Sequence, residues 1–149
     1  MEYELQQSPK KYIKTTDGIS LRGEWTPVFT FSTPGDLSVT YITQNANYVR
    51  IMSMVFVQFW VNMFPFTHTT ASGSARLTGL PFPVLVQDTS DITAVGSCIW
   101  NGITAAGYSQ VTPYIDQGNS LINFFLSGSG SAADSLSATH MPTGGNPAL

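Results

Sequence analysis

Residues 55–63 read Val-Phe-Val-Gln-Phe-Trp-Val-Asn-Met, and this stretch constrains the fold more than any other part of the chain. Every odd-numbered position is apolar, whereas the even-numbered positions hold two aromatic and two amide side chains. Successive side chains of a β-strand point to opposite faces, so this period-two alternation predicts a strand with one face packed in a core. We expect the odd-numbered face to be the core face.

The rest of the chain predicts further short strands, separated by segments rich in Gly, Ser, Asp and Asn. No segment has a sustained apolar period of about 3.6 residues, so helices are not expected. Short strands with frequent turn signals are typical of β-sandwiches and jelly rolls. We therefore expect an all-β fold, an antiparallel β-sandwich that is jelly-roll-like. The expected strands cover residues 25–31, 39–43, 48–51, 55–63, 75–80, 92–100, 109–115 and 121–126, with a turn at 45–47.

The chain of 149 residues has the length of one domain. We expect residues 1–22 to form an extended N-terminal arm and residues 23–127 to form the sandwich. Residues 128–149 begin with a Gly/Ser run, Ser127-Gly-Ser-Gly-Ser131, whose composition favours flexibility. We therefore expect a C-terminal tail that is ordered where another subunit covers it.

Charged residues make up only 10% of the chain, against about 25% in an ordinary soluble domain. Such a surface is typical of virion components, secreted β-proteins and oligomers. The net charge of −3 and the lack of a dense basic patch argue against nucleic-acid binding. No secretory signal is expected, and polar residues interrupt the most apolar stretch, residues 51–66, so membrane insertion is not expected either.

The N-terminal arm is locally basic and also carries apolar side chains. A free tail would leave these apolar side chains exposed to water. One interpretation is a docking arm that binds an acidic neighbour, and the other is a solvated leader. The docking interpretation rests on Tyr3, Leu5, Lys10, Lys11, Tyr12, Ile13 and Lys14.

No pattern of residues predicts catalysis or a cofactor. His68 and His140 lack partners at metal-ligand spacing and are expected to be exposed in loops. Cys98 is the single cysteine and lies in an expected strand, where it would act as a small apolar residue. Asp88 and Asp91 lie in a turn-like segment, where Asp commonly bonds to the backbone. We expect no enzyme activity, no cofactor and no metal.

Phe56 and Trp60 lie on the strand face opposite the expected core. Soluble monomers avoid exposing large aromatic side chains next to one another. Either a second sheet of the same chain or another subunit must then cover them. Because interfaces are depleted in Lys, Glu and Asp, the low charge content favours a subunit interface at Phe56 and Trp60.

Four segments follow one another in a fixed order: Gly23-Glu-Trp-Thr-Pro27, Val39-Thr-Tyr-Ile-Thr-Gln-Asn-Ala-Asn-Tyr-Val-Arg-Ile51, Val55-Phe-Val57 and Leu77-Thr-Gly-Leu-Pro-Phe-Pro83. Together they resemble the β-sandwich modules in virion proteins of tailed bacteriophages, such as tail fibres and tailspikes. The resemblance spans about residues 23–83. One departure is Asn47, where the modules usually have glycine; both residues tolerate a positive φ.

The resemblance implies a homotrimeric knob located in the virion, which builds the particle or touches the host. The chain has no heptads and no shaft, which favours a capsid decoration or head-fibre protein, or a small tail-attached knob. Its expected partners are other virion proteins, of the capsid or the tail, reached through the arm. The alternative is a receptor-binding tip that recognises host surface glycans through Trp100, Asn101 and Tyr108.

Overall fold

The structure is a computed structural model that describes residues 11–15, 18–86 and 94–149, with side chains from Leu21 onward. The expectations for Tyr3, Leu5 and Lys10, and for Asp88 and Asp91, lie outside the described residues.

The first sheet is antiparallel, with strand order β1-β2-β4-β5. Its two long strands, β4 and β5, are joined by a tight turn at Met52 and Ser53, and Met52 has a φ of 55°. The strands are β1 (Lys11–Thr15), β2 (Gly18–Glu24), β4 (Ser38–Ile51) and β5 (Met54–Thr67).

The second sheet is also antiparallel, with strand order β3-β6-β9-β8-β7, and β10 pairs with β9. Its strands are β3 (Val28–Thr33), β6 (Ser72–Thr78), β7 (Ala94–Val95), β8 (Gln110–Ile115), β9 (Ile122–Gly128) and β10 (Ser131–Ser135). One short 3-10 helix, Ala138–His140, follows β10. No helix among the described residues is long and apolar enough to cross a membrane.

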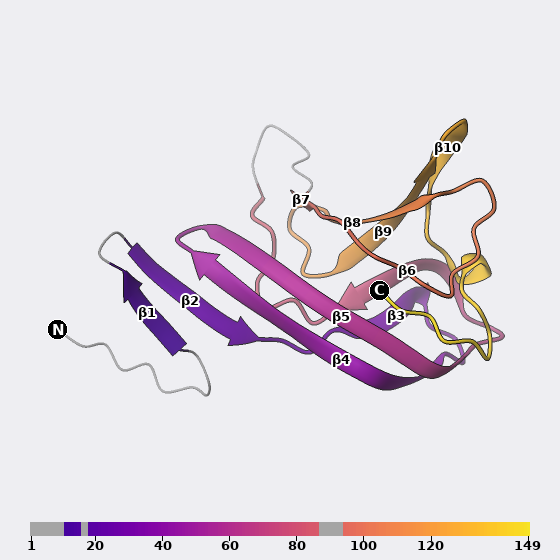
Figure 1. Ribbon diagram of the computed structural model, residues 1–149, viewed down its shortest axis with the longest axis horizontal. Coiled ribbons are helices and arrows are strands. Elements are labelled where there is room, and N and C mark those ends of the chain that lie inside the picture. Colours follow the sequence, from indigo (N-terminus) through magenta and orange to yellow (C-terminus); the bar gives the residue numbers. More distant parts are fainter. Residues whose placement is uncertain (1–10, 16–17, 87–93) are drawn as a thin grey trace.

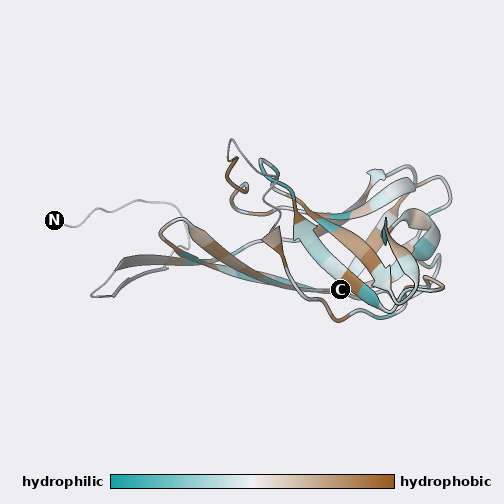
Figure 2. Cartoon of the chain, turned by 90° about the horizontal axis from the view of Figure 1, so that it is seen from above, coloured by the Kyte–Doolittle hydropathy of each residue, from teal (hydrophilic) through white to brown (hydrophobic). Residues whose placement is uncertain are grey.

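The two sheets pack over only part of their length. The Thr67 end of β5 lies over the second sheet, whereas β1, β2 and the turn between β4 and β5 project beyond it (Figures 1 and 2). The core contains an edge-to-face cluster in which the ring centroids of Phe29 and Phe66 are 5.4 Å apart. Phe31 completes this cluster from β3. The all-β sandwich expected from the sequence is confirmed.

The core face of β5 is also confirmed. Val61 and Met63 are fully buried, and Val55, Val57 and Phe59 are partly buried against the core. Burial declines toward Val55 because that end of the strand lies beyond most of the second sheet.

The expectation of two strands separated by a turn at residues 45–47 is wrong. Residues 38–51 form the single strand β4, in which Asn45 lies opposite Trp60 and Asn47 opposite Gln58. Both asparagines are exposed, so their amides stay in water while their backbone remains in the ladder. Local composition alone favoured a turn, whereas pairing with β5 on one side and β2 at its end favours a continuous strand.

Two other segments differ from expectation. Only Ala94 and Val95 form a strand within the described part of residues 92–100. Residues 128–149, expected to be a flexible tail, instead supply β10 and the buried residues Leu136, Met141 and Leu149. Apolar side chains spaced along this segment pack against the sandwich of the same chain, which outweighs the Gly/Ser character of its start.

Candidate functional site

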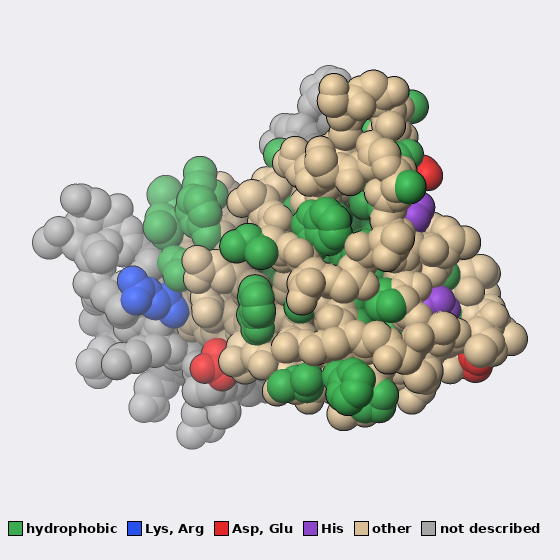
Figure 3. All heavy atoms as spheres, turned by 45° about the vertical axis from the view of Figure 1, so that its right-hand side comes forward, with side chains coloured by type: hydrophobic (Ala, Val, Ile, Leu, Met, Phe, Trp, Pro, Cys, Tyr) green, Lys and Arg blue, Asp and Glu red, His purple; other side chains and the backbone are tan. Residues whose placement is uncertain are grey.

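The outer face of the first sheet exposes large apolar side chains at β5. Phe56 is 56% exposed and Trp60 is 46% exposed. Met54, on the same face, is 59% exposed. No layer formed by the described residues covers this face. Figure 3 shows one side of the molecule, where hydrophobic side chains lie among uncharged groups and charged groups are few.

The edge of β5 that faces away from β4 has backbone partners along one half only. The N–H of Val61 donates to the carbonyl of Leu149, and the N–H of Leu149 donates back to the carbonyl of Val61, at 3.0 Å each. The N–H of Met63 donates to the carbonyl of Pro147 at 3.1 Å. The C-terminal segment thus pairs antiparallel with this half of β5 through isolated bridges, without forming a strand of the sheet itself.

The other half of the same edge is open. Alternate residues of a strand direct their backbone groups to opposite sides, so Val55, Val57 and Phe59 point theirs the same way as Val61. Within the part of the chain that the structure describes, nothing pairs with these outward groups. An unpaired edge of this kind is a template for another strand.

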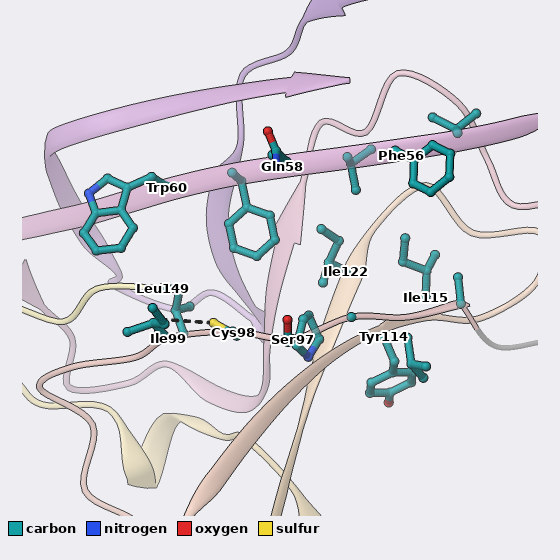
Figure 4. A pocket seen from close by; sticks show the side chains of 17 residues that line it. Phe56, Gln58, Trp60, Ser97, Cys98, Ile99, Tyr114, Ile115, Ile122 and Leu149 are labelled. Carbon is teal, nitrogen blue, oxygen red and sulfur yellow. Dashed lines mark hydrogen bonds between the residues drawn. The ribbon is translucent and has the colours of Figure 1, made fainter. Parts of the chain in front are cut away.

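A groove of about 640 Å³ lies beside this open edge. Figure 4 shows side chains of β5 on one side of it, with Cys98, Ile99 and Leu149 on the other. The lining contains no charged side chain and is mostly apolar. It consists of residues 55–60, 94–99 and 113–115, together with Ile122 and Leu149.

Cys98 lies in the wall of this groove, outside any strand and only half-buried. Its thiol donates to the carbonyl of Ile99 at 3.3 Å. Burial raises the pKa of the Cys98 thiol to about 11, because the charged thiolate is poorly solvated there. The thiol is therefore protonated at neutral pH and is a weak nucleophile.

A second, polar depression of about 440 Å³ lies where β2 passes β4, lined by residues 24–26 and 44–47. The indole Nε1 of Trp25 is buried and lacks a hydrogen-bond partner in the structure. Trp25 itself is only 8% exposed, so its ring offers no flat face to a ligand.

The three candidate glycan contacts lie in the segment between β7 and β8. Trp100 and Tyr108 are half-buried and pack against the core, and the ring of Tyr108 meets that of His140 edge-on at 6.4 Å. Asn101 is exposed, and its backbone exchanges two hydrogen bonds with Ala148 at 3.1 Å. The two aromatic rings are therefore mainly part of the packing.

Both histidines are more enclosed than expected. The ring of His68 lies against Phe31 at 5.2 Å and Phe66 at 5.6 Å, and its Nε2 is buried. The Nδ1 of His140 accepts a hydrogen bond from the backbone N–H of Ser137 at 3.1 Å. His68 lies in a loop as predicted, whereas His140 lies in the 3-10 helix, and both are half-buried instead of fully solvent-exposed. The described residues contain no group of three His, Cys, Asp or Glu that could hold a metal ion.

Part of the expected docking arm belongs to the first sheet. Lys11, Tyr12, Ile13 and Lys14 lie in β1, at the edge of the sheet opposite β5. Residue 11 pairs with Arg22 of β2, which in turn pairs with Val49 of β4.

The open edge and its groove were not predicted from the sequence. The apolar residues at 94–99 suggested only a strand, and no local signal connected them with β5. The pairing of Val61 with Leu149 depends on contacts between distant parts of the chain.

Comparisons with protein-family models, with curated proteins and with solved structures find no match. The fold and the surface therefore define the class: an antiparallel β-sandwich with a projecting four-stranded sheet and an open apolar edge.

Proposed function

We propose that the protein is a non-enzymatic structural subunit of a bacteriophage virion. It acts as a capsid decoration or head-fibre protein, or as a small tail-attached knob. In this proposal it self-associates as a homotrimer and docks on other virion proteins through its N-terminal arm.

The exposed apolar side chains of β5 are the observation that carries the proposal. Phe56 and Trp60 are exposed on one face of β5. The sheet that contains β5 extends beyond the second sheet at its β1 and β2 end (Figure 1). Apolar side chains gathered on a protein surface mark interaction sites. The low charge content supports the same conclusion, because interface cores are depleted in charged residues.

The arm supports contact with a different, acidic partner. Four of the six basic residues, namely Lys10, Lys11, Lys14 and Arg22, lie within the first 22 positions. This leaves the body with most of the acidic groups. A basic edge on a weakly charged subunit favours an acidic neighbour on the particle.

Light scattering tests self-association. We expect the mass of three 16.1 kDa chains for the native protein. The double variant Phe56→Ser/Trp60→Ser should shift it toward one chain, because it removes the apolar contact. Leu85→Ser is the matched control, because Leu85 is 64% exposed but belongs to no strand of the first sheet. A native mass of one chain at every concentration would refute the trimer.

Sedimentation with assembled particles tests docking. A variant with Lys10, Lys11 and Lys14 changed to Glu should keep the mass of the native oligomer but lose association with particles. Particle binding equal to that of the native protein would show that the basic arm does not dock.

The receptor-binding alternative has a separate test. Sugar sites use exposed aromatic faces, and Trp100 and Tyr108 are half-buried. A glycan array with the purified protein, repeated with Asn101→Ala, would favour this alternative only if it gave hits that the variant loses.

A further inference from the structure

We propose that the open edge of β5 binds residues 1–5 of a second copy of this chain as an added antiparallel strand. The inference rests on the proposed self-association but not on the virion location. It adds a second contact between copies, namely strand exchange at the edge of β5, to the contact through the outer face at Phe56 and Trp60.

The edge already accepts antiparallel backbone pairing. The C-terminal segment pairs antiparallel with β5 as far as Val61, so the next free pairing positions are Phe59, Val57 and Val55. This stretch of five residues is about 17 Å long at roughly 3.3 Å per residue, which is enough for an added strand of five residues. Main-chain hydrogen bonds of an added strand give affinity, and pockets for alternate side chains give specificity.

The groove requires apolar side chains at every second position of the added strand. Its volume of about 640 Å³ and its uncharged lining suit several such side chains. The sequence begins Met-Glu-Tyr-Glu-Leu, in which Met1, Tyr3 and Leu5 alternate with two glutamates. Pairing of Leu5 with Val55, Tyr3 with Val57 and Met1 with Phe59 places the apolar side chains over the groove. The same register turns both glutamates to the outer face.

The reach of the chain favours a second copy over the same copy. Residue 11 lies in β1, three strands from β5, so a strand added beyond β5 is four spacings away, about 19 Å. The six links from residue 5 to residue 11 span at most about 21 Å. The straight line from residue 11 to a strand added beyond β5 runs through β2 and β4. A path over either face of the sheet must also pass around the side chains of β2 and β4. To fold back in this register the chain would have to run almost fully extended over a face of the sheet, which favours pairing with a second copy.

Strand exchange of this kind is head-to-tail, because the arm of one copy meets a different surface on the next. Such contacts close into a ring when the rotation between copies permits. In a ring of three copies every arm binds an edge and every open edge is paired, in agreement with the proposed homotrimer.

The native cysteine in the groove provides a direct test in the full chain. Tyr3→Cys and Leu5→Cys each place a second thiol where the proposal puts an apolar side chain. Prolonged oxidation with excess oxidised glutathione, long enough to offset the low thiolate fraction of Cys98, should then join that thiol to Cys98 of another copy. The two thiols lose two protons and two electrons, which reduce the glutathione disulfide. Glu4→Cys is the matched control, since its side chain points away from the groove. A disulfide needs its Cα atoms within about 7 Å, so only a docked arm reacts efficiently.

A mixing experiment separates exchange from folding back. A chain carrying Tyr3→Cys/Cys98→Ser is mixed with native chain and oxidised. We expect a cross-linked pair on a non-reducing gel and none from either chain alone. A cross-link formed within single chains of the Tyr3→Cys variant would overturn exchange.

Two further outcomes decide the proposal. Cross-linking at Tyr3→Cys and Leu5→Cys no greater than at Glu4→Cys, in a protein that remains trimeric, overturns strand exchange and leaves self-association standing. A protein that is monomeric by light scattering overturns both.

Discussion

Val61 of β5 and Leu149 exchange two backbone hydrogen bonds, each 3.0 Å long, so residues 88 positions apart in the chain form one antiparallel pair. Both side chains are buried, with Leu149 2% exposed. This pair marks the point on the β5 edge where internal pairing ends and the open edge begins.

Leu149→Ala should lower the free energy of unfolding by about 2–5 kcal/mol, because it leaves a cavity at a buried site. Urea denaturation followed by tryptophan fluorescence measures the change. Ile99→Ala is the control: Ile99 is 81% exposed, so its loss should change stability by less than about 0.5 kcal/mol. Equal effects of the two substitutions would contradict the packing of Leu149.

Gly23→Ala should also destabilise the fold. Gly23 of β2 pairs with Tyr48 of β4, and a Cβ at position 23 would lie 2.6 to 2.7 Å from atoms of the Tyr48 ring. Tyr48 is buried and packs edge-on against Phe82 with ring centroids 5.4 Å apart, so it has little room to move. We expect a loss of about 1–3 kcal/mol from overpacking.

The control for this substitution is a double-mutant cycle with Tyr48→Leu. If the clash with the Tyr48 ring is the cause, Gly23→Ala should cost much less in the Tyr48→Leu background. The same cost in both backgrounds would assign the effect to the backbone instead.

Asp36 should make stability depend on pH in the acid range. Its carboxylate accepts hydrogen bonds from the hydroxyl groups and backbone N–H groups of Thr69 and Thr70. These bonds, that from the Thr69 hydroxyl foremost, hold the pKa of Asp36 well below its ordinary value of 3.8. Because the folded-state pKa is depressed, the stabilisation is present above about pH 4 and is lost as the pH falls toward the folded-state pKa.

Thermal melts between pH 7 and pH 2 test this dependence. Asp36→Asn should melt at a lower temperature than the native protein at pH 7, and the difference between them should shrink below pH 4. The comparison between the two proteins cancels the contribution of the other carboxylates. A difference in melting temperature that stays constant over the whole range would contradict the role of the charged carboxylate.

Cys98 should react slowly with iodoacetamide. Burial raises the pKa of its thiol from 9.0 to about 11, which lowers the thiolate fraction at pH 8 by about a hundredfold. Mass spectrometry of the alkylated protein measures the rate, which should rise by a similar factor in guanidinium. Ser53→Cys in a Cys98→Ser background is the control, since Ser53 lies in the exposed turn between β4 and β5. Native-state rates that are equal at the two positions would contradict the enclosed environment of Cys98.

Much of the sandwich could be predicted because its signals are local. The alternation at residues 55–63 identified a strand and its core face, since side-chain direction in a strand follows from sequence position alone. The exposed side chains of Phe56 and Trp60 followed from the same alternation.

The tertiary structure decided what depends on distant pairing. Asn45 and Asn47 lie in a continuous strand because β5 provides their ladder, and His68 is enclosed because Phe31 and Phe66 meet beside it. The sequence by itself determined that β5 has a core face and an aromatic outer face. Only the fold decided that its edge is closed at Val61 by Leu149 and open from Phe59 to Val55, because backbone pairing between remote segments leaves no local pattern in the sequence.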